Sequence, residues 1–166
     1  MIGVDYKIDL LRAQFASLFS TGFTAYGRAF VNQKEEGLIP EVLDGSDYKD
    51  VLLDDNLQKG LCFFVVENDE EPLESSGVDY LAKVSIYFAV NLSLIYPTVT
   101  ERAVSYLHRD VIEEISDSEF TVLAFRKGLP AFEAFDMVKP SDNMQPFYLV
   151  RFETEVEYQI NENYNC

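Results

Sequence analysis

The segment KVSIYFAVNLSL, residues 83–94, decides the fold. Apolar side chains occupy every second position from Val84 to Leu94, and they alternate with a set that includes Lys83, Tyr87 and Asn91. A side-chain period of two over this length is typical of a strand with one buried face and one more polar face. The sequence therefore predicts a long strand here.

A helix is expected directly after this strand. Tyr96-Pro97 should end the strand, and the sequence from Thr98 to Glu101 has the spacing of a capping box, in which a Thr hydroxyl and a Glu carboxylate satisfy free backbone N–H groups. The next residues form an apolar face at helical spacing: Val104, Leu107, Val111, Ile112 and Ile115. A strand followed by a helix that packs back on the sheet indicates an α+β fold.

The chain has 166 residues, of which 48% are hydrophobic and 14% aromatic, and this composition predicts one packed domain over residues 1–166. The N-terminus lacks the pattern of a signal peptide, and no apolar run reaches the ~18 residues of a membrane span. Cys62 is interpreted as a core thiol and Cys166 as a free thiol in the tail.

Periodicity predicts the remaining elements. The first is an N-terminal helix with apolar positions from Ile8 to Leu18, which Asp5 can cap. Four further strands are expected, over residues 24–31, 61–66, 120–125 and 147–160. A hairpin is plausible from the first of them to residues 38–43, where Pro40 favours an edge position, whereas residues 48–59 fit either a short helix or a packed loop. We expect a mostly antiparallel sheet of about four to five strands, with two helices packed on one face.

Two long segments interrupt these elements. Residues 67–79 form an acidic loop, and residues 128–146 form an irregular excursion with apolar side chains at Phe132, Phe135 and Met137. Loops of this length are usually functional or disordered. The three apolar residues are candidate anchors in a neighbouring subunit, and they are equally compatible with covering the core of their own domain. Residues 161–166 are expected to fray.

The formal charge of −16 is concentrated in one part of the chain. Residues 35–79 hold fourteen acidic residues against two lysines, a net charge of −12, whereas residues 1–34 have a net charge of +2. Binding to nucleic acid through phosphate neutralisation requires a basic face, so this distribution argues against it. Acidic loops also keep a protein soluble, which is the simpler interpretation.

The sequence offers little for catalysis, and we expect neither an enzyme nor a bound cofactor or metal. His108 is the single histidine, and more often such a residue packs at the margin of an apolar helix face. Nucleotide-binding glycine patterns and a nucleophile elbow are absent from the sequence. The spacing of Asp44, Asp47, Asp50, Asp54 and Asp55 misses the calcium-loop pattern, so a solvated turn is expected there.

The order of the predicted elements resembles the compact α+β fold of tail-terminator and head-to-tail completion proteins of tailed bacteriophages. The segments VNLSLIYP (residues 90–97), ERA (101–103) and DVIEEI (110–115) look like those of neck or ring proteins of phages that infect Bacteroidetes, including crAss-like phages. The sequence LDDNL at residues 53–57, before a strand, is similar as well.

This resemblance implies a structural virion protein in the phage neck or tail, present in the host cytoplasm during assembly. It implies a ring of six or twelve copies that contacts the portal and other neck or tail proteins and no membrane. DNA would pass through without specific binding. An acidic surface lining the channel would repel phosphates, and it has two candidate stretches, one of Glu67, Asp69, Glu70, Glu71 and Glu74, the other of Glu153, Glu155 and Glu157.

Two alternatives remain open. The basic N-terminal helix of one subunit could instead meet the acidic middle of the next, in a heterologous contact that closes a ring. From a different functional class, the acidic segments could copy the phosphates of DNA and inhibit a host nucleic-acid-binding protein. A mimic should act as a monomer or dimer, whereas a ring subunit should form large assemblies.

Overall fold

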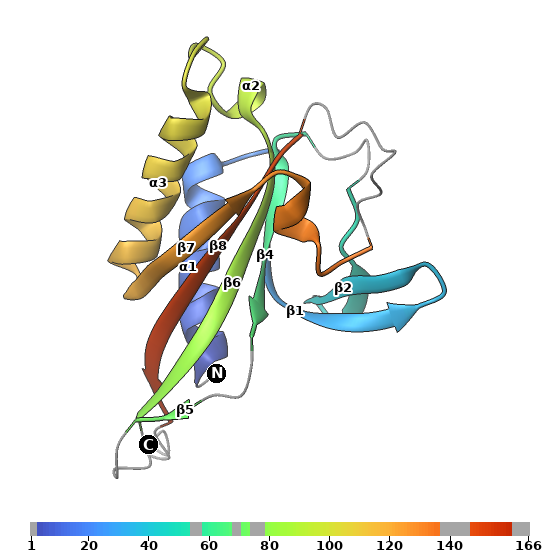
Figure 1. The fold of residues 1–166 in the computed structure, drawn as a ribbon, viewed down its shortest axis with the longest axis vertical. Helices are drawn as coiled ribbons and strands as arrows, with labels where there is room; N and C mark the ends of the chain where they lie inside the picture. Colours follow the sequence, from blue (N-terminus) through green and yellow to red (C-terminus); the bar gives the residue numbers. More distant parts are fainter. Residues whose placement is uncertain (1–2, 54–57, 68–70, 74–78, 137–146, 161–166) are drawn as a thin grey trace.

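The computed structural model describes residues 3–53, 58–67, 71–73, 79–136 and 147–160. In these ranges the helices are α1 (Val4–Phe19), α2 (Leu92–Ile95) and α3 (Ala103–Asp117), with the 3-10 helix η2 (Leu129–Phe132). The strands are β1 (Phe23–Lys34), β2 (Gly37–Asp44), β3 (Asp47–Asp50), β4 (Gly60–Val66), β5 (Glu71–Pro72), β6 (Asp79–Asn91), β7 (Phe120–Lys127) and β8 (Phe147–Gln159). The α+β class is confirmed (Figure 1).

All eight strands belong to one sheet, in the order β3-β2-β1-β4-β6-β8-β7, with the short β5 paired to β6. Every pairing is antiparallel except that of β1 with β4. The predicted four to five strands were therefore too few. The additional strands are short pieces, β3 and β5, whose four and two residues carry no readable alternation.

The two long helices lie on one face of this sheet, as predicted (Figure 1). Apolar residues of α1 and α3 pack there against alternate residues of β4, β6 and β8, and Phe15 contacts Phe88 edge-on with ring centroids 5.0 Å apart. The fully buried members from the helices are Ile8, Leu11, Phe15, Leu107, Val111 and Ile115. Burial of these side chains is the main stabilising term for the first core.

The opposite face of β6 is buried as well, which corrects the prediction of a more polar face. Ser85, Tyr87 and Ala89 point away from the helices, yet each is almost inaccessible to solvent. Residues 128–136 cover this face and form a second core with Phe132 and Phe135 above Tyr87. The cover comes from a segment forty residues away in sequence, so the period of β6 alone could not indicate it.

Four local predictions were wrong. The strand that Tyr96-Pro97 should have ended stops at Asn91, and residues 92–95 form the helix α2 instead. The helix α3 starts at Ala103 after Arg102, which has left-handed backbone angles and makes no side-chain cap, so no capping box forms at Thr98–Glu101. Gly3, and not Asp5, occupies the N-cap of α1. Pro40 lies in an interior strand, because β3 pairs with the far side of β2.

Candidate functional site

A three-stranded arm projects from the body of the domain (Figure 1). We define the arm as residues 29–50, which comprise the outer half of β1 together with β2 and β3. β1 pairs with β4 as far as Arg28 and with β2 from Ala29 onward, and a register irregularity lies just before this change of partner, between Ala25 and Arg28. Such irregularities bend a strand and re-aim the residues beyond the bend. Two tight turns, at residues 35–36 and 45–46, then close the arm.

One face of the arm exposes large apolar side chains to solvent. Leu43 pairs directly with Tyr48 across β2 and β3, and their exposed fractions are 52% and 60%. Phe30 lies on the same face of the neighbouring strand, two positions out of register with Leu43, and is also half exposed. The guanidinium of Arg28 lies 5.0 Å from the ring centroid of Phe30. An exposed aromatic cluster on a small domain marks a surface for interaction.

Ion pairs fix charges on both faces of the arm: those of Lys34 lie on the face of Leu43 and Tyr48, and that of Lys49 lies on the other face. Lys34 contacts Glu41 at 3.2 Å and also pairs with Asp50, and these two bonds raise the pKa of Lys34, with Asp50 contributing more. Lys49 donates to Asp44 at 2.6 Å, which likewise raises the pKa of Lys49. Two of the aspartates for which a solvated turn was expected, Asp44 and Asp50, are thus paired with lysines. In the described part of the chain, no three His, Cys, Asp or Glu side chains converge to hold a metal ion, and Asp54 and Asp55 lie outside it.

The excursion after β7 ties the arm to the body. The Leu38 amide donates to the carboxylate of Asp136 at 2.7 Å, and the Asp136 amide donates to the Leu38 carbonyl at 2.9 Å. A further bond joins the Val51 amide to the Pro40 carbonyl at 2.8 Å. The arm is therefore held at the root and near the tip of its hairpin.

Two of the three candidate anchors lie in their own domain's core. Phe132 and Phe135 are both almost fully buried and meet Tyr87 edge-on, with centroid distances of 5.2 Å for each. Phe63 stacks parallel on Tyr87 at 4.8 Å beneath them. Within a single subunit these phenylalanines therefore cover the sheet, the second of the two uses considered from sequence. Met137 lies outside the described residues.

The candidate acidic stretches differ in their neighbours. Glu153, Glu155 and Glu157 follow one another along the open half of β8, on the face away from the helices. Arg151 donates to Glu153 at 2.8 Å, Arg126 lies 3.7 Å from the same carboxylate, and Lys83 is paired in register with Glu155. Glu153 and Glu155 lie between β6 and β7, whereas Glu157 lies beyond the last pair of β7 with β8 and is paired with β6 alone.

The second acidic stretch is only partly described. Glu67 follows β4, where its amide bonds to the Lys83 carbonyl at 2.8 Å, and Glu71 is exposed in β5. Asp69, Glu70 and Glu74 lie outside the described residues.

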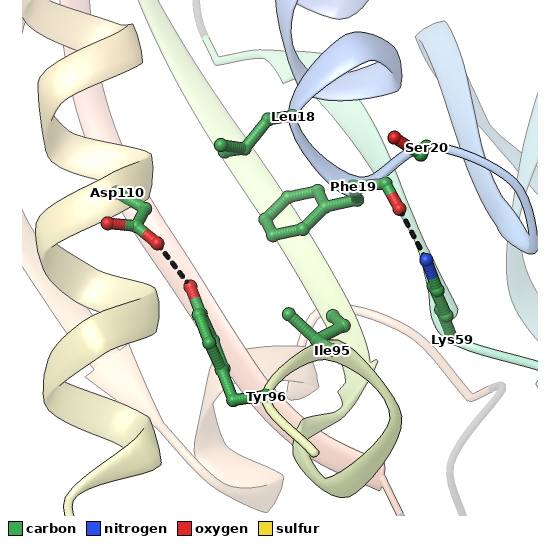
Figure 2. A pocket seen from close by; sticks show the side chains of 7 residues that line it. All are labelled: Leu18, Phe19, Ser20, Lys59, Ile95, Tyr96 and Asp110. Atoms are coloured by element: carbon green, nitrogen blue, oxygen red, sulfur yellow. Dashed lines mark hydrogen bonds between the residues drawn. The ribbon is translucent and has the colours of Figure 1, made fainter. Parts of the chain in front are cut away.

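A small pocket of about 160 Å³ lies between the end of α1 and the segment after β6 (Figure 2). Its floor is apolar, with Phe19 and Ile95, and polar groups stand on opposite walls. The Tyr96 hydroxyl donates to Asp110 at 2.6 Å, and the Lys59 ammonium donates to the Phe19 carbonyl at 2.8 Å. Burial and the Asp110 bond raise the pKa of Tyr96, so its phenol stays protonated. The first bond joins the end of α2 to α3, and the second joins the end of α1 to the segment before β4, so both stabilise the fold.

His108 packs among aromatic rings. Its ring lies 4.7 Å from Phe125 and 5.5 Å from Phe152, and its Nε2 is 3.0 Å from the Tyr148 hydroxyl. Burial lowers the pKa of His108, and the positive charge of Lys127 lowers it further. Burial also raises the pKa of Tyr148 to about 12. The imidazole is neutral at pH 7 and hydrogen-bonds a neutral phenol, which agrees with the packing role expected from sequence.

Sequence reasoning missed the arm as a surface. The alternation over residues 24–31 indicated a strand, but neither the bend in β1 nor the pairing of Leu43 with Tyr48 could be read from it. The signal that was available is the turn at residues 44–47 between two short segments with tyrosine and leucine, which is typical of a hairpin. Asp136 carried no recognisable signal.

Comparison with known proteins finds no matching family model and no matching curated protein. Within the described residues, no helix is both long and apolar enough to cross a membrane.

Proposed function

We propose that this chain is a structural subunit of a tailed-phage neck, which assembles with copies of itself into a ring between the portal and the tail and leaves a passage for DNA. This proposal rests on the arm, which projects from the body, is held by the hydrogen bonds between Leu38 and Asp136, and exposes large apolar side chains. Phe30, Leu43 and Tyr48 stay about half exposed in a single chain, whereas burial against a partner would favour association by about 25 cal/mol per Å² of apolar surface removed from water.

The body supports this role because it is rigid. One sheet carries a core on each of its faces, the first under α1 and α3 and the second under η2. Interdigitated cores transmit load with little deformation. A connector that holds its shape while DNA moves past needs such a body, and no reaction step is required of it.

The charge supports a passage for DNA. On the face away from the helices, β8 carries Glu153, Glu155 and Glu157. The cations on this face are Arg126 and Arg151, which contact Glu153, and Lys83, which is paired in register with Glu155. Phosphates approaching such a surface meet no uncompensated basic site, so DNA would slide without sticking. Glu67 and Glu71 are the described members of the second candidate lining.

The alternative is an acidic DNA mimic that inhibits a host nucleic-acid-binding protein. The regular row of glutamates on β8 favours it, since alternate residues of a strand present charges at a spacing of roughly 6.8 Å. However, Arg151 and Arg126 contact Glu153, and Lys83 faces Glu155. This partial neutralisation weakens the resemblance to a phosphate backbone, and the ring subunit is the better-supported function.

The test is native mass spectrometry of the purified chain, alone and mixed with the portal encoded beside it, followed by negative-stain imaging. We expect closed rings of six or twelve copies, formed alone or on the portal. A chain that stays monomeric in both conditions, and that competes with DNA for a host protein, would replace the ring proposal with the mimic.

A further inference from the structure

We infer that neighbouring subunits join by docking the arm of one copy on the β7 edge of the next. The occupant of the β7 edge is thus a second copy of this chain. This inference rests on the proposed ring and specifies the contact that would build it.

The acceptor surface is the free edge of the sheet. β7 is the last strand in the order, and its outer side has no strand partner among the described residues. We define the edge strip as Leu123, Phe125, Arg126, Lys127 and Leu129. Leu123 and Phe125 are 50% and 43% exposed, and Leu129 extends the apolar surface into η2. A register shift between Val122 and Ala124 brings Leu123 out of the regular ladder.

Charge distinguishes this edge from the arm. Residues 120–129 contain Arg126 and Lys127 and no acidic residue, whereas the arm contains six acidic residues and two cations, Lys34 and Lys49. The Lys127 ammonium lies 5.5 Å from the Phe125 ring centroid, so a cation and an apolar ring are presented together. The arm has the opposite net charge: Leu43 and Tyr48 lie on one face near the turn at residues 45–46, and Asp47 with the Lys49–Asp44 pair lies on the other face at the same turn. Opposite charges around apolar centres favour association and fix its orientation.

Position in the fold makes the contact heterologous. The arm ends in β3, and β3 and β7 are the two opposite ends of the strand order. The arm also projects on the side away from α3 and β7 (Figure 1). A surface at one end that fits a different surface at the other end repeats from copy to copy, and it forms a ring when the rotation closes.

The first experiment uses two complementary variants. The arm variant carries Leu43→Ser and Tyr48→Ser, and the edge variant carries Leu123→Ser and Lys127→Glu. Leu10→Ser, on the exposed side of α1 and of similar exposure, is the matched control. Circular dichroism and thermal unfolding confirm that each variant is folded. Sedimentation velocity then measures self-association.

We expect each variant to be monomeric at concentrations where the wild type and the control assemble, with a self-association constant weakened at least about tenfold. The decisive sample is an equimolar mixture of the two variants. With the arm docked on the β7 edge, the arm variant keeps an intact edge and the edge variant keeps an intact arm, so the mixture forms one-to-one dimers and no larger species.

A charge exchange gives a second readout. Asp47→Lys and Lys127→Glu should each weaken assembly, and the double variant should recover part of it. Two results would overturn the docking geometry. One is unchanged assembly of both the arm variant and the edge variant, which would mean that the ring forms through other surfaces. The other is a mixture that stays monomeric. A wild-type chain that fails to assemble even with the portal refutes the proposed function instead.

Discussion

Leu38 and Asp136 are joined by two reciprocal hydrogen bonds, although 98 residues separate them in sequence. Each residue donates its amide to the other, one to a carboxylate and one to a carbonyl. This pair links the arm, close to its turn at residues 35–36, to the segment 128–136 that covers the second core.

Replacement of Asp136 should loosen the arm without unfolding the domain. Asp136→Ala removes the acceptor of the Leu38 amide and should lower the free energy of local opening there by about 1 kcal/mol. Hydrogen exchange at the Leu38 amide should then be about fivefold faster, while exchange in β6 is unchanged. Glu133→Ala, on the same segment but bonded only to Arg126 among the described residues, is the control. Equal exchange at Leu38 in both variants would contradict this account of the brace.

Phe132 and Phe30 offer a matched pair of phenylalanines with opposite environments. Phe132→Ala opens a cavity above Tyr87 and should reduce the free energy of unfolding by about 3–5 kcal/mol. Phe30→Ala, on the open arm, should cost about 1 kcal/mol or less and should weaken self-association instead. Urea unfolding and sedimentation velocity measure the two effects. A stable Phe132→Ala monomer would mean that this ring belongs to an intersubunit contact.

Gly60 lies where the chain cannot accept a side chain. Its φ is +127°, and a Cβ would stand 2.0 Å from the Ala89 carbonyl oxygen of the neighbouring strand. Gly60→Ala should therefore destabilise the protein by at least about 3 kcal/mol, because two backbones must separate. Gly45, with φ of +70° and open space around it, is the control and should cost about 1–2 kcal/mol for backbone strain alone. Thermal unfolding of both variants decides the comparison, and similar losses would refute it.

His108 is the single histidine of the chain, so its effect on the pH dependence of stability can be measured directly. Because burial lowers the pKa of His108 in the folded chain, the folded state binds fewer protons than the unfolded state as the pH falls below the ordinary value of 6.5. The stability associated with a neutral imidazole is complete above pH 6.5 and is lost as the pH falls through the lowered pKa. NMR titration of the imidazole should give a midpoint below 6.5.

The matched variant isolates this effect from the many carboxylates. His108→Gln should show a shallower loss of stability than the wild type between pH 6.5 and 5, measured by urea unfolding at each pH. A midpoint at or above 6.5, or parallel stability curves, would show that His108 gains no protection from its aromatic neighbours.

Local pattern was informative where it was repeated and long. The alternation in β6 and β8 and the helical spacing from Leu107 to Ile115 correctly located the first core, because each element there contributes a regular face. The second core could not be predicted, since Tyr87 and Phe132 meet only through tertiary folding. The capping prediction failed for a related reason. Arg102 adopts a left-handed conformation that moves the helix start past Glu101.

The arm could not be predicted from the local sequence pattern either. Pro40 indicated an edge strand, and the sign that the four residues of β3 would pair outside it was the turn at residues 44–47. Whether a surface is exposed depends on what the rest of the chain leaves uncovered. For this reason the exposure of Leu43 and Tyr48 could not be predicted from the sequence.

The position of β6 between two cores bears on how this chain can vary in length. Phe88 belongs to the core beneath the helices, and its neighbour Tyr87 belongs to the core beneath η2. Insertion or deletion of one residue in the middle of β6 would exchange the two faces beyond that point and misplace both sets of side chains at once. The turn at residues 35–36 touches neither core and carries no such constraint. Homologous chains should therefore differ in length at the tip of the arm and keep β6 free of gaps.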